Sequence, residues 1–137
     1  MPAKVYINLP VKDLRQSIDF FSEVGFRIDP LFTDKNASCM TVSEDVNVML
    51  LSERFFSKFS GKRIADATKE TEVILTVMTD SREKVDEIVT SAMNAGALPS
   101  LGTQDHGFMY QKSFQDLDGH MWEIMYNDPQ AFNTPAY

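Results

Sequence analysis

The 137-residue chain has few of the residues that build disulfide frameworks or metal clusters: one cysteine, Cys39, and two histidines. A single cysteine cannot form a disulfide within the chain, and this favours a reducing cytoplasm as the compartment. The same scarcity excludes a Cys/His zinc cluster within one chain, because a structural zinc ion takes four such ligands.

Long apolar runs and excess positive charge are also missing. No apolar run approaches the roughly 20 residues that a membrane-spanning helix needs, and the opening "MPAKVYINLP" enters a strand-like pattern with no signal peptide. Asp and Glu outnumber Lys and Arg by 20 to 13. The resulting net charge of −7 argues against nucleic acid and against an anionic membrane surface as partners. The length and the 43% hydrophobic content fit one compact domain.

The first half of the chain, residues 1–58, reads as one strand, one helix and three strands. Alternating apolar residues in "VYINLPV" predict the first strand. Asp13 and Gln16 form a capping box for the helix that follows, and Gly25 ends it. Three short strand candidates come next, at 26–32, 38–43 and 46–52.

The second half, residues 70–128, repeats this order after a connector at 59–69. A strand at 71–80 leads into a helix that we expect to begin with a capping box of Asp80 and Glu83. A weak strand at 97–102 and a hairpin of 107–114 with 120–126 complete the unit, and a tail follows at 129–137. The repeat predicts an α+β fold of two tandem βαβββ modules whose sheets close around a shared concave face, the expected cleft.

One acid, Glu123, stands in the apolar final strand "HMWEIMY". Strand parity places it on one face with Met121 and Met125. A buried carboxylate costs several kcal/mol unless it is paired, protonated or bound to a metal. Glu123 is therefore either a metal ligand or general base, or a carboxylate that is only hydrogen-bonded to cleft neighbours, and both interpretations stay open.

Other candidates for the cleft are polar or soft side chains on strands. Tyr6 and Asn8 share the mixed face of the first strand, and Met49 offers a thioether to an adaptable apolar ligand. Tyr110 and Gln111 lie in the penultimate strand, whose register the sequence does not reveal. His106, in a glycine-flanked loop, is either an acid/base or gating residue or an exposed loop histidine. Three phenylalanines near helical spacing could form a lid, a subunit interface or ordinary packing: Phe55, Phe56 and Phe59.

The segments "LPVKDLRQSIDFF", "VGF" and "DLDGHMWEI", in this order, resemble the vicinal oxygen chelate superfamily. This superfamily includes glyoxalase I, the bleomycin and fosfomycin resistance proteins and the extradiol dioxygenases. The resemblance covers essentially the whole chain. It implies paired βαβββ modules that form a U-shaped cleft, association as a homodimer and, in the catalytic members, a divalent metal in the cleft.

The resemblance also indicates where the family's four metal ligands would fall. They fall on Tyr6, on Met49, within the range 72–74 and on Glu123; Glu123 is retained, and Glu72 is a second candidate. A phenol and a thioether do not replace an imidazole and a carboxylate for a hard ion. We therefore expect a protein that binds a small, partly apolar molecule in its cleft, with no cofactor. A metal-dependent lyase, isomerase or dioxygenase with Glu123 as a ligand is the alternative.

Overall fold

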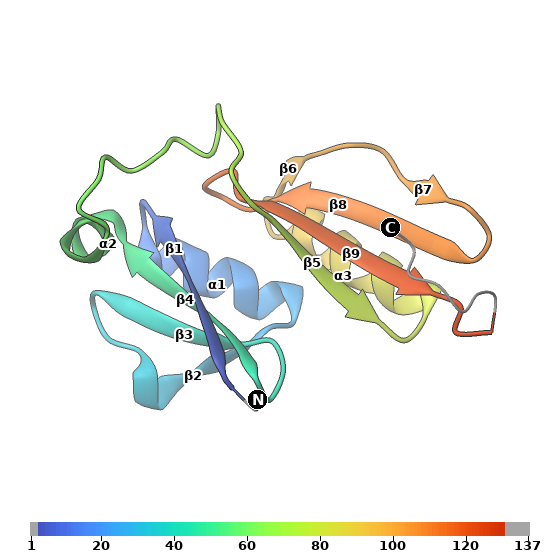
Figure 1. The fold of residues 1–137 in the computed structure, drawn as a ribbon, viewed down its shortest axis with the longest axis horizontal. Helices are drawn as coiled ribbons and strands as arrows, with labels where there is room; N and C mark the ends of the chain where they lie inside the picture. The colour runs from blue at the N-terminus through green and yellow to red at the C-terminus, as the bar shows by residue number, and fades with distance from the viewer. Residues whose placement is uncertain (1–2, 131–137) are drawn as a thin grey trace. The chain divides into compact units, whose positions relative to one another are not determined.

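A computed structural model describes residues 3–130 and divides the chain into two compact units with the boundary between Asp66 and Ala67 (Figure 1). Each unit contains its own mixed sheet and its own covering helix. The predicted α+β class is confirmed. Within residues 3–130, no helix has both the length and the apolar character to cross a membrane. Most of the predicted tail lies outside the described residues.

Unit 1 contains a four-stranded sheet in the order β1-β4-β3-β2, with β1 parallel to β4 and the other neighbours antiparallel. A second, short helix follows the last strand. The elements, in chain order, are β1 (Val5–Val11), α1 (Leu14–Val24), β2 (Arg27–Asp29), the 3-10 turn η1 (Pro30–Phe32), β3 (Ala37–Thr41), β4 (Val46–Ser52) and α2 (Glu53–Ser60).

Helix α1 forms where the sequence predicts it, because both of its ends are capped. The carboxylate of Asp13 accepts a hydrogen bond of 3.1 Å from the backbone N–H of Gln16. Gly25 ends the helix with φ at 111°, a conformation that only glycine adopts without strain. The apolar stripe of α1 covers one face of the sheet and leaves the opposite face open. The core between helix and sheet includes Leu9, Val11, Phe20, Phe21, Met40, Val48 and Leu50.

The strand predicted at 26–32 is wrong beyond its first half. Only Arg27–Asp29 is strand. Pro30 has no N–H to donate to a ladder, and the carboxylate of Asp29 accepts a hydrogen bond from the N–H of Leu31 at 3.0 Å. Together they turn the chain into η1, which carries the exposed side chains of Leu31 and Phe32 beside the open face.

Unit 2 repeats the arrangement around a sheet in the order β5-β9-β8-β6, with β5 parallel to β9. Helix α3 packs against one face, over a core that includes Val85, Val89, Phe114, Trp122 and Ile124. The elements are β5 (Ile74–Thr79), α3 (Arg82–Asn94), β6 (Leu98–Pro99), β7 (Gln104–Asp105), β8 (Met109–Gln115) and β9 (Met121–Asn127).

Two sequence-based expectations for unit 2 are corrected. The cap of α3 is Ser81, whose hydroxyl accepts from the N–H of Lys84 at 3.1 Å, so the predicted capping box at Asp80 is one residue too early. The strand predicted at 97–102 shrinks to two residues, because Pro99 cannot donate to the ladder. The short strand β7, which pairs with β8, was not predicted.

Candidate functional site

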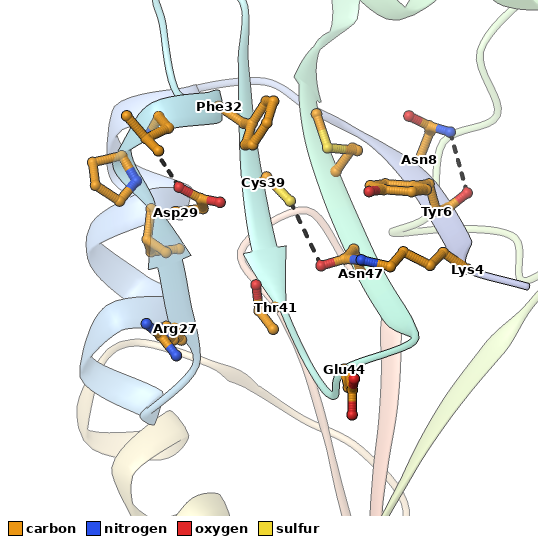
Figure 2. Close-up of a pocket in the computed structure, with 14 residues that line it drawn as sticks. Lys4, Tyr6, Asn8, Arg27, Asp29, Phe32, Cys39, Thr41, Glu44 and Asn47 are labelled. Carbon is orange, nitrogen blue, oxygen red and sulfur yellow. Dashed lines mark hydrogen bonds between the residues drawn. The ribbon is translucent and has the colours of Figure 1, made fainter.

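The open face of the unit 1 sheet carries a hollow of about 860 Å³ (Figure 2). Strand alternation directs Tyr6 and Asn8 of β1 to this face, and the register pairs them with Asn47 and Met49 of β4. All four residues line the hollow. The structure therefore brings together the three unit 1 residues that the sequence singled out, and it adds Asn47.

The floor of this hollow is formed by two buried polar groups, Cys39 and Asn47, which are 4% and 8% exposed. The thiol donates a 3.8 Å hydrogen bond to Asn47 Oδ1, as Figure 2 shows. Burial raises the pKa of the Cys39 thiol, and the nearby charge of Asp29 raises it further. Cys39 thus stays protonated and acts as a hydrogen-bond donor that orients the Asn47 amide, rather than as a nucleophile.

A second hollow of about 510 Å³ adjoins the first, since Asn8 and Met49 line both. Helix α2 forms the far wall of this second hollow. The hydroxyl of Ser52 caps the start of the helix by accepting a 3.3 Å hydrogen bond from the backbone N–H of Phe55. The helix presents three phenylalanines to the hollow: Phe55, Phe56 and Phe59. The rings of Phe55 and Phe59 meet edge to face at 5.0 Å between centroids. The first hollow, which holds the polar and charged lining residues beside apolar ones, is called the polar hollow, and the second is called the aromatic hollow; they meet at Asn8 and Met49.

In unit 2, Glu123 lies on the sheet face opposite α3 and is hydrogen-bonded through both carboxylate oxygens. Thr76 Oγ1 donates to Oε1 at 2.9 Å, and Gln111 Nε2 donates to Oε2 at 2.8 Å. The register pairs Gln111 with Met125, so both flank the acid on its own face. Two neutral donors from its own sheet thus account for the carboxylate, as one interpretation of the sequence required.

The two units have equivalent positions at the centre of their parallel strand pairs. Met49 is paired with Asn8 in unit 1, and Glu123 is paired with Thr76 in unit 2. Tyr6 and Ile74 each lie two residues before the paired residue of the outer strand. The family position that the sequence placed within 72–74 is therefore Ile74.

This set of residues does not fit a resident divalent metal. A phenol, a thioether, an alkyl group and one carboxylate stand at the four family positions: Tyr6, Met49, Ile74 and Glu123. Divalent ions need several hard oxygen or nitrogen donors at once. Nowhere between residues 3 and 130 do three or more His, Cys, Asp or Glu side chains gather as such a donor set.

Two further candidates lie away from these faces. Tyr110 is on the helix side of the unit 2 sheet, where its hydroxyl donates to Asp86 of α3 at 2.5 Å and its ring lies under the guanidinium of Arg82. His106 is exposed in the turn between β7 and β8, and its backbone N–H donates a 2.8 Å hydrogen bond to the backbone carbonyl of Met109. Both positions belong to surface networks of unit 2.

Sequence reasoning missed Asn47, although the signal was present. In "VNVMLLS" the residue two before Met49 shares its face, and this alternation could have found Asn47. Arg27 and Asp29 of β2 could not have been found in this way, because they reach the hollow only through the pairing of β2 with β3. Thr76 likewise becomes a partner of Glu123 only through the parallel pairing of β5 with β9.

Comparison with known proteins agrees with this fold. The family model described as Glyoxalase/Bleomycin resistance protein/Dioxygenase superfamily matches residues 5–124. The chain belongs to this superfamily. A search of the curated proteins found no match.

Solved structures share the fold over nearly the whole chain. Hypothetical protein SA1046 from S. aureus is 26% identical with a TM-score of 0.77, and the alignment covers 92% of this chain and 95% of that one. A glyoxalase-related enzyme from Fulvimarina pelagi is 18% identical with a TM-score of 0.77, over 93% and 89% of the two chains. Lactoylglutathione lyase from Agrobacterium tumefaciens is 16% identical with a TM-score of 0.68, over 96% and 98%. The last two likenesses concern the fold alone.

Proposed function

We propose that this protein binds a small, partly apolar molecule in the hollows on the open face of unit 1, without the family's metal site. The observation that carries the proposal is Met49. It stands where the equivalent position of unit 2 has Glu123, and it joins a polar hollow to an aromatic one. A flexible, polarizable thioether suits a ligand contact and is a poor ligand for a hard cation.

The hydrogen bonds of the Glu123 carboxylate support the same proposal. Its oxygens accept hydrogen bonds from Thr76 and Gln111, so the charge is stabilised within its own sheet without a cation. The acid then acts as a polar lining group. The expected compartment is the cytoplasm, and the expected assembly is a homodimer.

A metal-dependent lyase, isomerase or dioxygenase is the second candidate. It is favoured by one observation, the presence of the carboxylate of Glu123 at the family's fourth position in a chain that belongs to the superfamily. In that case Glu123 would exchange its bonds to Thr76 and Gln111 for a cation.

Two measurements separate these functions. In the first, protein purified without chelator is analysed for metal content and then titrated with Ni, Zn, Mn and Fe. If the binding proposal holds, the purified protein contains less than about 0.1 equivalent of metal per chain, on the order of the background for adventitious ions, and the titration shows no site-specific uptake. Binding of N-phenyl-1-naphthylamine, a neutral aromatic fluorophore, is measured in parallel. Met49→Ser and Phe59→Ser are expected to weaken it at least about tenfold, the scale of one lost apolar anchor.

The matched control is Met93→Ser, which makes the same change at an exposed position of α3 and is expected to leave fluorophore binding unchanged. One divalent ion per chain, or fluorophore binding that ignores Met49→Ser and Phe59→Ser, would contradict the proposal.

A further inference from the structure

The amide nitrogen of Asn47 is a hydrogen-bond donor that faces the polar hollow. Asn47 is only 8% exposed, and its Oδ1 is occupied by the thiol of Cys39. Among residues 3–130, its Nδ2 donates to no other group, and this atom is open to the hollow rather than sealed from water. Because Oδ1 is held by the thiol, the amide is oriented with its N–H groups toward the hollow, where a ligand oxygen can accept from them. The floor of the hollow is therefore built to receive an oxygen acceptor.

Two cationic side chains of the lining can attract an acceptor that is anionic. Lys4 and Arg27 line the hollow, and neither forms an ion pair with another described residue. In Figure 2 the Lys4 side chain runs toward the Asn47 side of the hollow. A hydrogen bond to an ionised oxygen is about twice as strong as one between neutral groups. An anionic oxygen over Asn47 would gain from the amide and from the ammonium group together.

The two acids of the lining are placed differently. The carboxylate of Asp29 accepts from the N–H of Leu31 at 3.0 Å and holds the start of η1. Glu44 is exposed in the connection between β3 and β4. Asp29 lies in β2, two strands away from Asn47, whereas Lys4 directly precedes β1, the strand beside Asn47. A cationic group would meet the Asn47 donor at the floor with the wrong polarity.

The rest of the ligand must cross Met49 to reach the aromatic hollow. Met49 lines both hollows, and Phe55 and Phe59 offer ring faces and edges beyond it. Flat apolar groups pack well against such rings and against a thioether.

We propose that the ligand is a flat, largely apolar molecule with an anionic oxygen at one end, a carboxylate, sulfonate or phenolate. Asn47 Nδ2 and Lys4 bind the oxygen, and the α2 phenylalanines take the apolar end. This inference rests on the proposed function, and it adds the chemistry of the head group.

The test compares two fluorophores with the same skeleton. 8-Anilinonaphthalene-1-sulfonate carries an anionic sulfonate, and N-phenyl-1-naphthylamine does not. The wild-type chain is expected to bind the sulfonate more tightly. Asn47→Asp keeps the shape of the side chain but places a like charge at the floor, and it should weaken sulfonate binding about tenfold or more while changing binding of the neutral fluorophore less than about twofold.

Lys4→Gln changes an exposed side chain and cannot act through misfolding of the core. It should weaken sulfonate binding several-fold and reduce its dependence on salt. Asn94→Asp makes the same chemical change as Asn47→Asp at the exposed end of α3, and it should leave both affinities unchanged. The side-chain NH₂ signals of Asn47, identified as the pair lost from the NMR spectrum of Asn47→Asp, should move on addition of the sulfonate and stay in place with the neutral fluorophore.

The inference is overturned if Asn47→Asp and Lys4→Gln leave sulfonate binding unchanged, or if they weaken both fluorophores equally. In either case, loss of binding in Met49→Ser and Phe59→Ser would leave the proposed function standing. If neither fluorophore binds the wild-type chain, or if binding ignores Met49→Ser as well, the proposed function fails together with the inference.

Discussion

Thr76 donates a hydrogen bond of 2.9 Å to Glu123 across the parallel strands β5 and β9, which are 47 positions apart at this point. The equivalent pair in unit 1 is Asn8 and Met49, where no carboxylate is present. Two repeats of one fold thus place a charged group and a thioether at matching positions. The unit 1 position therefore offers no hard donor to a metal ion, and this difference guides the first prediction.

Substitution of Glu123 by Gln should leave the fold intact. The shape is kept, and the amide oxygen can accept from either Thr76 or Gln111 but not from both. We expect the free energy of unfolding to change by ~1 kcal/mol or less, as measured by urea denaturation. Thr76→Val, which removes one donor from the same carboxylate, is the matched comparison. A bound divalent ion that is present in the wild type and lost in Glu123→Gln would restore the enzyme hypothesis.

The homodimer prediction rests on the outer strands of the two sheets. β1 and β5 each have one unpaired edge, and they carry apolar side chains that are about half exposed, Val5, Ile74 and Met78. Such edges are normally covered. We expect sedimentation velocity at micromolar concentration to show a species of twice the chain mass, and Ile74→Lys to shift it toward the monomer. Met93→Lys, at an exposed position of α3, is the control. A monomer at all concentrations up to tens of micromolar would refute this prediction.

Asp116 should be the most costly polar residue to remove from the β8–β9 turn. It is 1% exposed and accepts hydrogen bonds from three donors, the N–H groups of Asp118 and His120 and the indole of Trp122. Asp116→Ala leaves these donors unpaired, and the expected loss is ~2 to 4 kcal/mol in free energy of unfolding. The control is Asp128→Ala. Among the described residues, this carboxylate accepts one hydrogen bond, from the exposed backbone N–H of Gln130, so its loss should lower the free energy of unfolding by about a few tenths of a kcal/mol at most. Equal effects of the two substitutions would contradict the assignment.

Gly119 should tolerate no side chain. Its φ is 89°, and a Cβ there would lie 2.7 Å from the carbonyl oxygen of Ala67. Gly119→Ala therefore combines backbone strain with a steric clash, and we expect a loss above ~2 kcal/mol. Gly107→Ala is the matched control, since φ is 81° but the space around it is open, and it should cost only ~1 kcal/mol. Thermal unfolding of both variants measures the difference in their stability. Similar melting temperatures would contradict the prediction, because they would mean that the backbone of Ala67 moves away from the added Cβ at little cost.

The contact between Asp86 and Lys112 predicts a pH dependence of stability. Hydrogen bonds from Lys112 first and from Tyr110 second lower the pKa of Asp86. A lowered pKa in the folded state means that the contribution is present above the unfolded pKa of about 3.9 and is lost as the pH falls through the folded pKa. The carboxylate is nearly half exposed, so we expect Asp86→Asn to cost only ~0.5 to 1 kcal/mol at pH 7.

Urea denaturation between pH 7 and pH 3 measures this effect. The difference in free energy of unfolding between the wild type and Asp86→Asn should become smaller as the pH falls. Glu87→Gln is the control, because its pair with Lys84 is exposed on both sides and 3.5 Å long; it should change stability by ~0.3 kcal/mol or less at any pH. A difference for Asp86→Asn that is constant with pH would rule out the ionised pair as its cause.

The sequence alone was enough to predict the repeated order of strands and helices, the ends of α1 and the side of β9 on which Glu123 lies. These features depend on local chemistry: alternation along a strand, a carboxylate at a helix start, and a glycine where φ must be positive. The register of β8 was beyond the sequence, and with it the fact that Gln111 rather than Tyr110 shares the face of Glu123.

Tertiary structure decided the remaining features of the candidate site, because they depend on contacts between distant segments. Thr76 meets Glu123 only once β5 lies beside β9. Asn47 becomes the floor of a hollow only when β2 and η1 come to lie beside β3. Pairing across such separations is set by the burial of whole sheet faces against α1 and α3, and no local pattern encodes it.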